Sequence, residues 1–126
     1  MGTGYKGNSK YYRSIGQNIL LASSKYHCEN GRFGTSSPST GNKTRNIASD
    51  NPLVTAKDFY DKIAFGGKET IYNGGKVNIT HIADGSIITM RPISSSPDQS
   101  PVVEINISGS SHTGGLKRQK IHFVEA

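Results

Sequence analysis

The stretch "RQKIHFVE" (residues 118–125) shows most clearly the pattern that decides the fold. Polar and apolar residues alternate along it, which is typical of a β-strand with one buried face. Lys120 and His122 would share one face of this strand, and Ile121 and Phe123 would share the other. A sheet that buries one face under helices and leaves the other in water is the simplest structure for such a strand.

The same alternation occurs in three earlier runs, "VNIT" (77–80), "IITMR" (87–91) and "VVEINI" (102–107). The apolar sets are Val77 with Ile79, Ile88 with Met90, and Val103 with Ile105 and Ile107. The turn signal "NGG" (73–75) predicts a hairpin between "ETIY" (69–72) and the first of these runs. Turn-length connections between consecutive strands predict an antiparallel meander. We expect every apolar set to face the helices and every polar set to face away.

Two segments before the strands have helical spacing. Residues 9–26 place apolar side chains on one side of a helix that Ser9 would cap, and "TAKDFYDKIAF" (55–65) precedes a glycine pair that would end a helix. Thr55 and Asp58 stand at capping-box spacing. The predicted fold class is therefore α+β, with one or two N-terminal helices packed on a twisted four- to five-stranded antiparallel sheet.

The length of 126 residues indicates a single domain covering residues 1–126. Residues 1–9 are expected to be a flexible lead-in. Residues 28–52 are rich in Gly, Ser, Asn and Thr and are interpreted as a long polar loop, either functional or mobile. Within it, Arg32, Lys43 and Arg45 could bind phosphates.

The net charge of +6 lies entirely in the first half of the chain. Residues 1–68 carry ten Lys or Arg against four acids, whereas residues 69–126 carry five of each sign. A basic half indicates a polyanionic partner, either a nucleic acid or an acidic protein. Cys28 is the only cysteine, so an internal disulfide is excluded. No apolar run approaches the ~20 residues of a membrane span, and no secretory signal is recognisable, so we expect no membrane partner.

The polar face of the predicted sheet brings together the residue types that RNA cleavage requires. Glu104, Arg91, Lys120 and His122 would come from neighbouring strands, about 5 Å apart. A carboxylate can take the proton of a ribose 2′-hydroxyl, and histidine can act as acid or base near its unperturbed pKa of ~6.5. Arginine and lysine can offset the charge that builds on the phosphate.

Further candidates would surround this catalytic set and bind the substrate. They are Thr89 and Asn106 on the same face, Ser94 after the second run, Arg118 at the start of the last strand, and His81, with His112 as another open candidate histidine. By its alternation with Val77 and Ile79, His81 would fall on the apolar side. The histidines lack metal-ligand spacing and the acids do not cluster, so we expect neither a metal nor another cofactor.

"HIADGSIITMRPISSSPDQSPVVEINI" (81–107) followed by "KRQKIHFVEA" (117–126) resembles the toxin domains of bacterial contact-dependent growth inhibition and other polymorphic toxin proteins. Within these it resembles the barnase–EndoU–colicin–RelE group of ribonucleases, and the resemblance covers about residues 76–126. In barnase the catalytic Glu precedes the arginines and the His comes last. Here Arg91 precedes Glu104, so only His122 keeps its place in that order. The resemblance implies a toxin carried at the C-terminal end of a larger secreted bacterial protein. Such a toxin cuts RNA, most often tRNA, in the target-cell cytoplasm, and a cognate immunity protein blocks it.

The alternative is a non-catalytic module that binds RNA or a protein through the same basic surface. Stacking of bases on aromatic side chains would favour this interpretation. Tyr5, Tyr11, Tyr12, Tyr26 and Phe33 could serve this role, but they lie in the N-terminal half, away from the polar face of the predicted sheet. A zinc deaminase is disfavoured because its characteristic His and Cys pattern is missing from the sequence.

Overall fold

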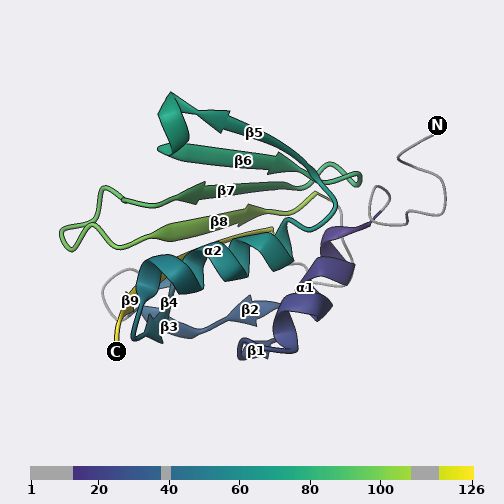
Figure 1. Cartoon of the computed structure of the whole chain (residues 1–126). Helices are drawn as coiled ribbons and strands as arrows, with labels where there is room; N and C mark the ends of the chain where they lie inside the picture. The colour runs from purple at the N-terminus through teal and green to yellow at the C-terminus, as the bar shows by residue number, and fades with distance from the viewer. Residues whose placement is uncertain (1–12, 38–40, 109–116) are drawn as a thin grey trace.

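Two helices cover one face of a seven-stranded sheet in the computed structural model, which describes residues 13–37, 41–108 and 117–126 (Figure 1). The α+β class is thereby confirmed. The helices are α1 (Ile15–Ser23) and α2 (Pro52–Ile63). The sheet has the order β3-β4-β9-β8-β7-β6-β5. Its strands are β3 (Thr35–Ser37), β4 (Gly41–Ser49), β5 (Lys68–Tyr72), β6 (Val77–His81), β7 (Ile87–Arg91), β8 (Val102–Asn106) and β9 (Arg118–Glu125).

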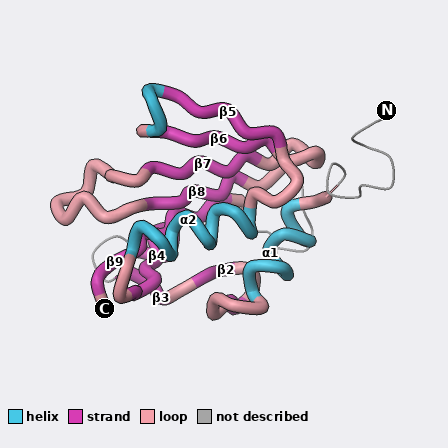
Figure 2. Tube along the Cα trace, viewed as in Figure 1, coloured by secondary structure: helices cyan, strands magenta, loops and turns pink. Residues whose placement is uncertain are grey.

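The antiparallel meander from β5 to β9 agrees with the prediction. Each of these strands pairs antiparallel with the next, and the turn at Asn73–Gly75 joins β5 to β6. Asn73, Gly74 and Gly75 have φ angles of 51°, 65° and 99°, a conformation that Gly and Asn tolerate better than other residues. The loops that join the strands are drawn in pink in Figure 2, among them the long connection between β7 and β8.

The interpretation of residues 28–52 as a long loop is wrong. This segment forms β1 (Cys28–Glu29), β2 (Arg32–Phe33), β3 and β4, and β4 pairs parallel with β9 from Thr44 to Ser49. Ladder hydrogen bonds are made by backbone groups, so a strand with few apolar side chains can still pair when its partner is held in place. The sheet is consequently larger than the four or five strands expected and is mixed rather than wholly antiparallel.

Arg45 on β4 stabilises this region from within. Its guanidinium donates hydrogen bonds to the backbone oxygens of Phe33 (2.9 Å) and Gly34 (2.7 Å) and to the hydroxyl of Ser36 (2.9 Å). Each nitrogen of the Arg45 guanidinium donates to the segment Phe33–Ser36, so Arg45 is engaged in holding the fold rather than presented as the phosphate ligand that the sequence suggested. Arg32 is exposed, and the side chain of Lys43 lies outside the described residues.

Both helices begin at caps other than those predicted. Ser14 caps α1 in a capping box with Gln17, whereas Ser9 lies outside the described residues. Asn51 caps α2 by accepting from the backbone N–H of Val54, and Pro52 occupies the first turn. An Asn cap followed by Pro is favourable at a helix start, so α2 begins before the Thr55 position that the sequence suggested.

The core between the helices and the sheet centres on Phe59 of α2. Its ring meets Phe33 of β2 at 4.9 Å, Tyr26 at 5.4 Å and Phe123 of β9 at 5.5 Å between centroids. The first two pairs are edge-to-face, an arrangement that aromatic rings favour. Phe33 is fully buried, so this residue serves packing and cannot stack a base.

A buried polar side chain fastens the two helices together. Asn18 of α1 has no exposed surface, and its amide donates to the backbone oxygens of Ile63 (2.9 Å) and Phe65 (3.0 Å) at the C-terminal end of α2. Its side-chain oxygen accepts from Arg13 at 2.6 Å. The carbonyls at a helix end have no hydrogen-bond donor within the helix, so the Asn18 amide supplies the donor that water would otherwise supply.

We predict that Asn18→Ala lowers the free energy of unfolding by about 2–3 kcal/mol, because the buried carbonyl of Ile63 and the partly buried carbonyl of Phe65 lose their donor. Leu20→Ala, on the same helix at a side chain that is 71% exposed, should change stability by less than about 0.5 kcal/mol. Denaturant unfolding followed by circular dichroism measures both values. Equal effects of the two substitutions would contradict the role assigned to Asn18.

None of the helices in the described part of the chain is both long and apolar enough to cross a membrane.

Candidate active site on the open face of the sheet

The open face is defined here as the face of the sheet opposite α1 and α2. Ile88, Met90, Val103, Ile105, Ile121 and Phe123 are buried in the core beneath the helices, so the residues that alternate with them point to the open face. The strand pairing arranges these alternate residues in rows. The rows are Ile87–Asn106–Arg118, Thr89–Glu104–Lys120–Thr44, and Arg91–Val102–His122–Asn46.

Glu104 lies at the centre of the open face. It is directly opposite Thr89 on one side and Lys120 on the other, so about 5 Å separates neighbouring Cβ atoms. His122 and Arg91 lie one step along the diagonal, about 7–8 Å away. Glu104 is only 9% exposed, which makes it the most buried charged residue of this group. Its carboxylate forms an ion pair with Arg118, whose own side chain is largely exposed.

Positive charge predominates on this face. Between β5 and β9 the strands place four Lys or Arg side chains there against one carboxylate: Lys68, Arg91, Arg118 and Lys120 against Glu104. Arg91 and Arg118 are exposed, whereas Lys120 is half-buried beside Glu104. The carboxylate therefore sits at the floor of a cationic surface. An anion that approached this floor would meet three cations from two strands.

A specific hydrogen bond holds His122. Its Nδ1 atom lies 3.0 Å from the hydroxyl of Ser100, in the loop between β7 and β8. The pKa of His122 is lowered from its ordinary value, first by burial and then by the neighbouring Lys120, while Asp98 acts in the opposite direction. Because Nδ1 is occupied by Ser100, Nε2 is the ring atom left for proton exchange with a bound molecule.

The loop that carries Ser100 is itself held by short-range hydrogen bonds. Asp98 accepts from the backbone N–H of Ser100 at 3.1 Å and from the hydroxyl of Ser96 at 2.6 Å. Ser96 in turn lies 2.7 Å from the hydroxyl of Ser94. These contacts hold the Asp98 pKa below its ordinary value, with the Ser96 hydrogen bond as the largest cause. The loop thus presents Ser100 to His122 from an ordered position.

The prediction of which β6 residues face the helices is wrong. Asn78 pairs with Met90 and Thr80 pairs with Ile88, so these polar residues face the helices, and the hydroxyl of Thr80 is hydrogen-bonded to Tyr60 of α2. Val77 and Ile79 therefore lie on the open face. The polar side can face inward here because β6 lies at the margin of the helix layer, where Tyr60 supplies a hydroxyl partner.

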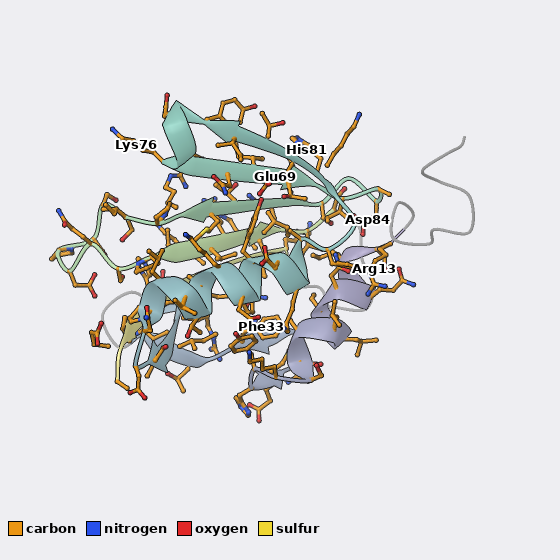
Figure 3. The ribbon with its side chains drawn as sticks, in the orientation of Figure 1. Arg13, Phe33, Glu69, Lys76, His81 and Asp84 are labelled. Carbon is orange, nitrogen blue, oxygen red and sulfur yellow. The ribbon has the colours of Figure 1, made fainter. Side chains whose placement is uncertain are left out.

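This correction also moves His81 to the open face, but not to the cluster. His81 is exposed at the end of β6 and pairs with Ile87 on β7, so two strand spacings, about 10 Å, separate it from the strand of Glu104. Figure 3 shows it at the end of the hairpin opposite Lys76. His112 lies outside the described residues.

The structure brings together seven of the nine side chains proposed for the site. They are His122, Glu104, Arg91, Lys120, Thr89, Asn106 and Arg118. Ser94 is 7% exposed and belongs to the hydrogen-bonded loop rather than to the surface that a substrate would touch. His81 is the only one of the nine that lies apart from both the cluster and its supporting loop.

Sequence reasoning missed Ser100, Asp98 and Asn46. Ser100 lies in the loop before β8, and the register that pairs Val102 with His122, and so brings Ser100 close to that histidine, is set by the tertiary structure. Asn46 gave no signal either, since its position beside His122 depends on the parallel pairing of β4 with β9. Parallel neighbours are distant in sequence and share no turn that would reveal their register.

Within the described residues, no group of three or more His, Cys, Asp or Glu side chains is arranged to hold a metal ion. Comparison with known proteins gave no match: no family model, no curated protein and no solved structure is significantly similar to the chain.

We predict that Lys120→Gln raises the pKa of His122, because the substitution removes a positive charge that disfavours the imidazolium form. Lys57→Gln is the matched control, since it removes the same charge from an exposed position on α2. Titration of the His122 ring protons by NMR measures both effects. An unchanged pKa in the Lys120 variant would show that the two side chains do not interact as their positions imply.

Proposed function

We propose that this protein is a ribonuclease that cleaves RNA by acid–base transesterification without a metal. The single observation that carries the proposal is the arrangement of Glu104, Lys120 and His122 on adjacent positions of β8 and β9, among further cations on the open face. A carboxylate, an imidazole and cations around one small area are the groups that this reaction uses.

In the proposed reaction, Glu104 takes the proton of a ribose 2′-hydroxyl while the 2′-oxygen forms a bond to the adjacent phosphorus. The bond from phosphorus to the 5′-oxygen breaks, and Nε2 of His122 gives that oxygen its proton. The products are a 2′,3′-cyclic phosphate and a free 5′-hydroxyl. Lys120, Arg118 and Arg91 offset the negative charge that grows on the phosphate oxygens.

Access to Glu104 depends on Arg118 in this proposal. The guanidinium of Arg118 is paired with Glu104 but remains largely exposed, so it can turn toward an incoming phosphate. A phosphate bound by Arg118 would compete for the guanidinium and leave the carboxylate free to accept a proton. In this proposal the same arginine therefore pairs with Glu104 before the substrate binds and helps to place the phosphate afterwards.

The resemblance to polymorphic toxin domains supports the biological setting of the proposal. It suggests a toxin carried at the C-terminal end of a larger secreted bacterial protein and acting on tRNA in the target-cell cytoplasm. A cognate immunity protein would block the site, and an acidic surface on that protein would complement the cations around Glu104.

We predict that the protein cuts total bacterial RNA into discrete fragments in the presence of EDTA. His122→Ala should reduce the rate by about 100- to 10,000-fold, the usual contribution of a positioned acid. His27→Ala removes an exposed histidine before β1 and should leave the rate unchanged. Gel analysis and identification of the 2′,3′-cyclic phosphate by mass spectrometry provide the measurements.

The alternative, a non-catalytic module that binds RNA or a protein through the same basic surface, predicts a different outcome in that assay. Such a protein would bind RNA or a partner but leave the RNA intact with and without divalent ions. If His122→Ala cut RNA at the parent rate, the protein would still be an enzyme, but His122 would take no part in the reaction.

The pH dependence distinguishes the two roles that His122 can take. As an acid, His122 acts in its protonated form, which is populated below its pKa. That pKa is lowered from its ordinary value, so we predict that kcat/KM falls as the pH rises through a value below ~6.5. Initial rates between pH 4 and 8 on one RNA substrate give the profile; a rise over the same range would assign His122 as the base instead.

A further inference from the structure

The open face has an apolar half beside its cationic half. Tyr72 of β5 pairs with Val77 of β6, and both point to this face together with Ile79. The side chain of Tyr72 is 45% exposed, and β5 is an edge strand of the sheet. Figure 1 shows the β5–β6 hairpin at the edge of the sheet, above α2 in the view. The cationic cluster thus continues into a surface with an exposed aromatic ring.

Tyr72 lies in the same row of the sheet as His122. Asn78 of β6 pairs with Met90 of β7, so Val77 lies beside Arg91. Arg91 pairs with Val102 of β8, and Val102 pairs with His122 of β9. The row therefore crosses β5, β6, β7, β8 and β9. Four strand spacings separate Tyr72 from His122, about 19 Å in a flat sheet. Arg91 stands between the two as an exposed cation.

Tyr72 differs from the other described tyrosines in what its side chain does. Tyr26 and Tyr60 are hydrogen-bonded through their hydroxyls to Asp58 and Thr80, and both belong to the core or pack against it. Within the described residues, Tyr72 is neither part of that core nor held by such a bond. An exposed ring on a sheet, in a row that continues to the exposed cation Arg91, suits the stacking of a single-stranded RNA base.

We propose that Tyr72, supported by Val77 and Arg91, forms a subsite for an unpaired base of an RNA strand that lies across the β-strands. The base would belong to a nucleotide several positions from the phosphate at His122. Arg91 would bind an intervening phosphate, and Lys76, exposed at the end of the hairpin, would neutralise the strand beyond Tyr72 (Figure 3). This inference rests on the proposed function and extends it to a substrate class, single-stranded RNA longer than the cleaved dinucleotide.

The test uses RNA binding in the His122→Ala background, so that the RNA stays intact. Fluorescence anisotropy compares an unpaired RNA of about twelve nucleotides with one of about four, a range that spans typical single-strand sites. Tyr72→Ala should weaken binding of the longer RNA by about 5- to 150-fold, which corresponds to the ~1–3 kcal/mol of one stacked base. Binding of the shorter RNA should not change, and Tyr72→Phe should retain the parent affinity.

Ile71→Ala is the matched control. Ile71 precedes Tyr72 on β5 and is 60% exposed, but it pairs with Asn78 and so lies on the helix side. Its substitution should leave both affinities unchanged. If Tyr72→Ala binds the longer RNA as tightly as its parent, or if Ile71→Ala weakens it equally, the subsite is overturned and the exposed ring is left for a protein partner.

A cleavage assay with the otherwise unaltered protein separates this inference from the proposed function. Tyr72→Ala should raise KM for the longer RNA with little change in kcat, because the subsite binds substrate away from the reacting atoms. If the protein binds long RNA through Tyr72 but cuts none, the proposed subsite stands and the proposed ribonuclease activity is overturned. Cleavage with a KM that is independent of Tyr72 would retain the ribonuclease and overturn the subsite.

Discussion

The pairing of β9 along both of its edges is the constraint on which the rest of this structure depends. β8 lies antiparallel to one edge and β4 parallel to the other, so β9 occupies the interior of the sheet. Side chains alternate along a strand, and a shift of one residue would move His122 into the core and Phe123 into solvent. Burial of Phe123 against Phe59 therefore sets the register that positions the candidate site.

The candidate site joins a buried carboxylate to an exposed cationic surface. Burial makes a lone carboxylate costly, and the pairing of Glu104 with Arg118 together with the nearby Lys120 offsets that cost. Burial and, after it, the charge of Lys120 lower the pKa of His122 below its ordinary value. In the proposed mechanism, one cluster of charges would supply a proton acceptor, a proton donor and a phosphate-binding surface, so a change in any member is expected to alter the others.

The two halves of the open face have different chemistry that suits one kind of ligand. Cations near Glu104 suit phosphates, whereas Tyr72 and its apolar neighbours on β5 and β6 suit bases. A protein partner could also use an exposed aromatic, but the row that links Tyr72 through Arg91 to His122 favours a strand of nucleic acid. The acidic side chains of α2, including Asp58 and Asp61, lie on the helix layer and so leave the open face electropositive.

The alternation in residues 87–91, 102–107 and 118–125 was enough to predict the meander and the face of Glu104, Lys120 and His122, because each strand has one fully buried side. The same reasoning failed at β6, where Tyr60 gives the inward Thr80 a hydrogen-bond partner and an apolar side is not required. Only the tertiary structure decided that β4 joins the sheet and that Ser100 holds His122. The alternation of polar and apolar residues indicates which side of a strand faces the core. Pairing between distant strands depends instead on backbone hydrogen bonds, which every residue but proline can both donate and accept, so the sequence does not reveal it.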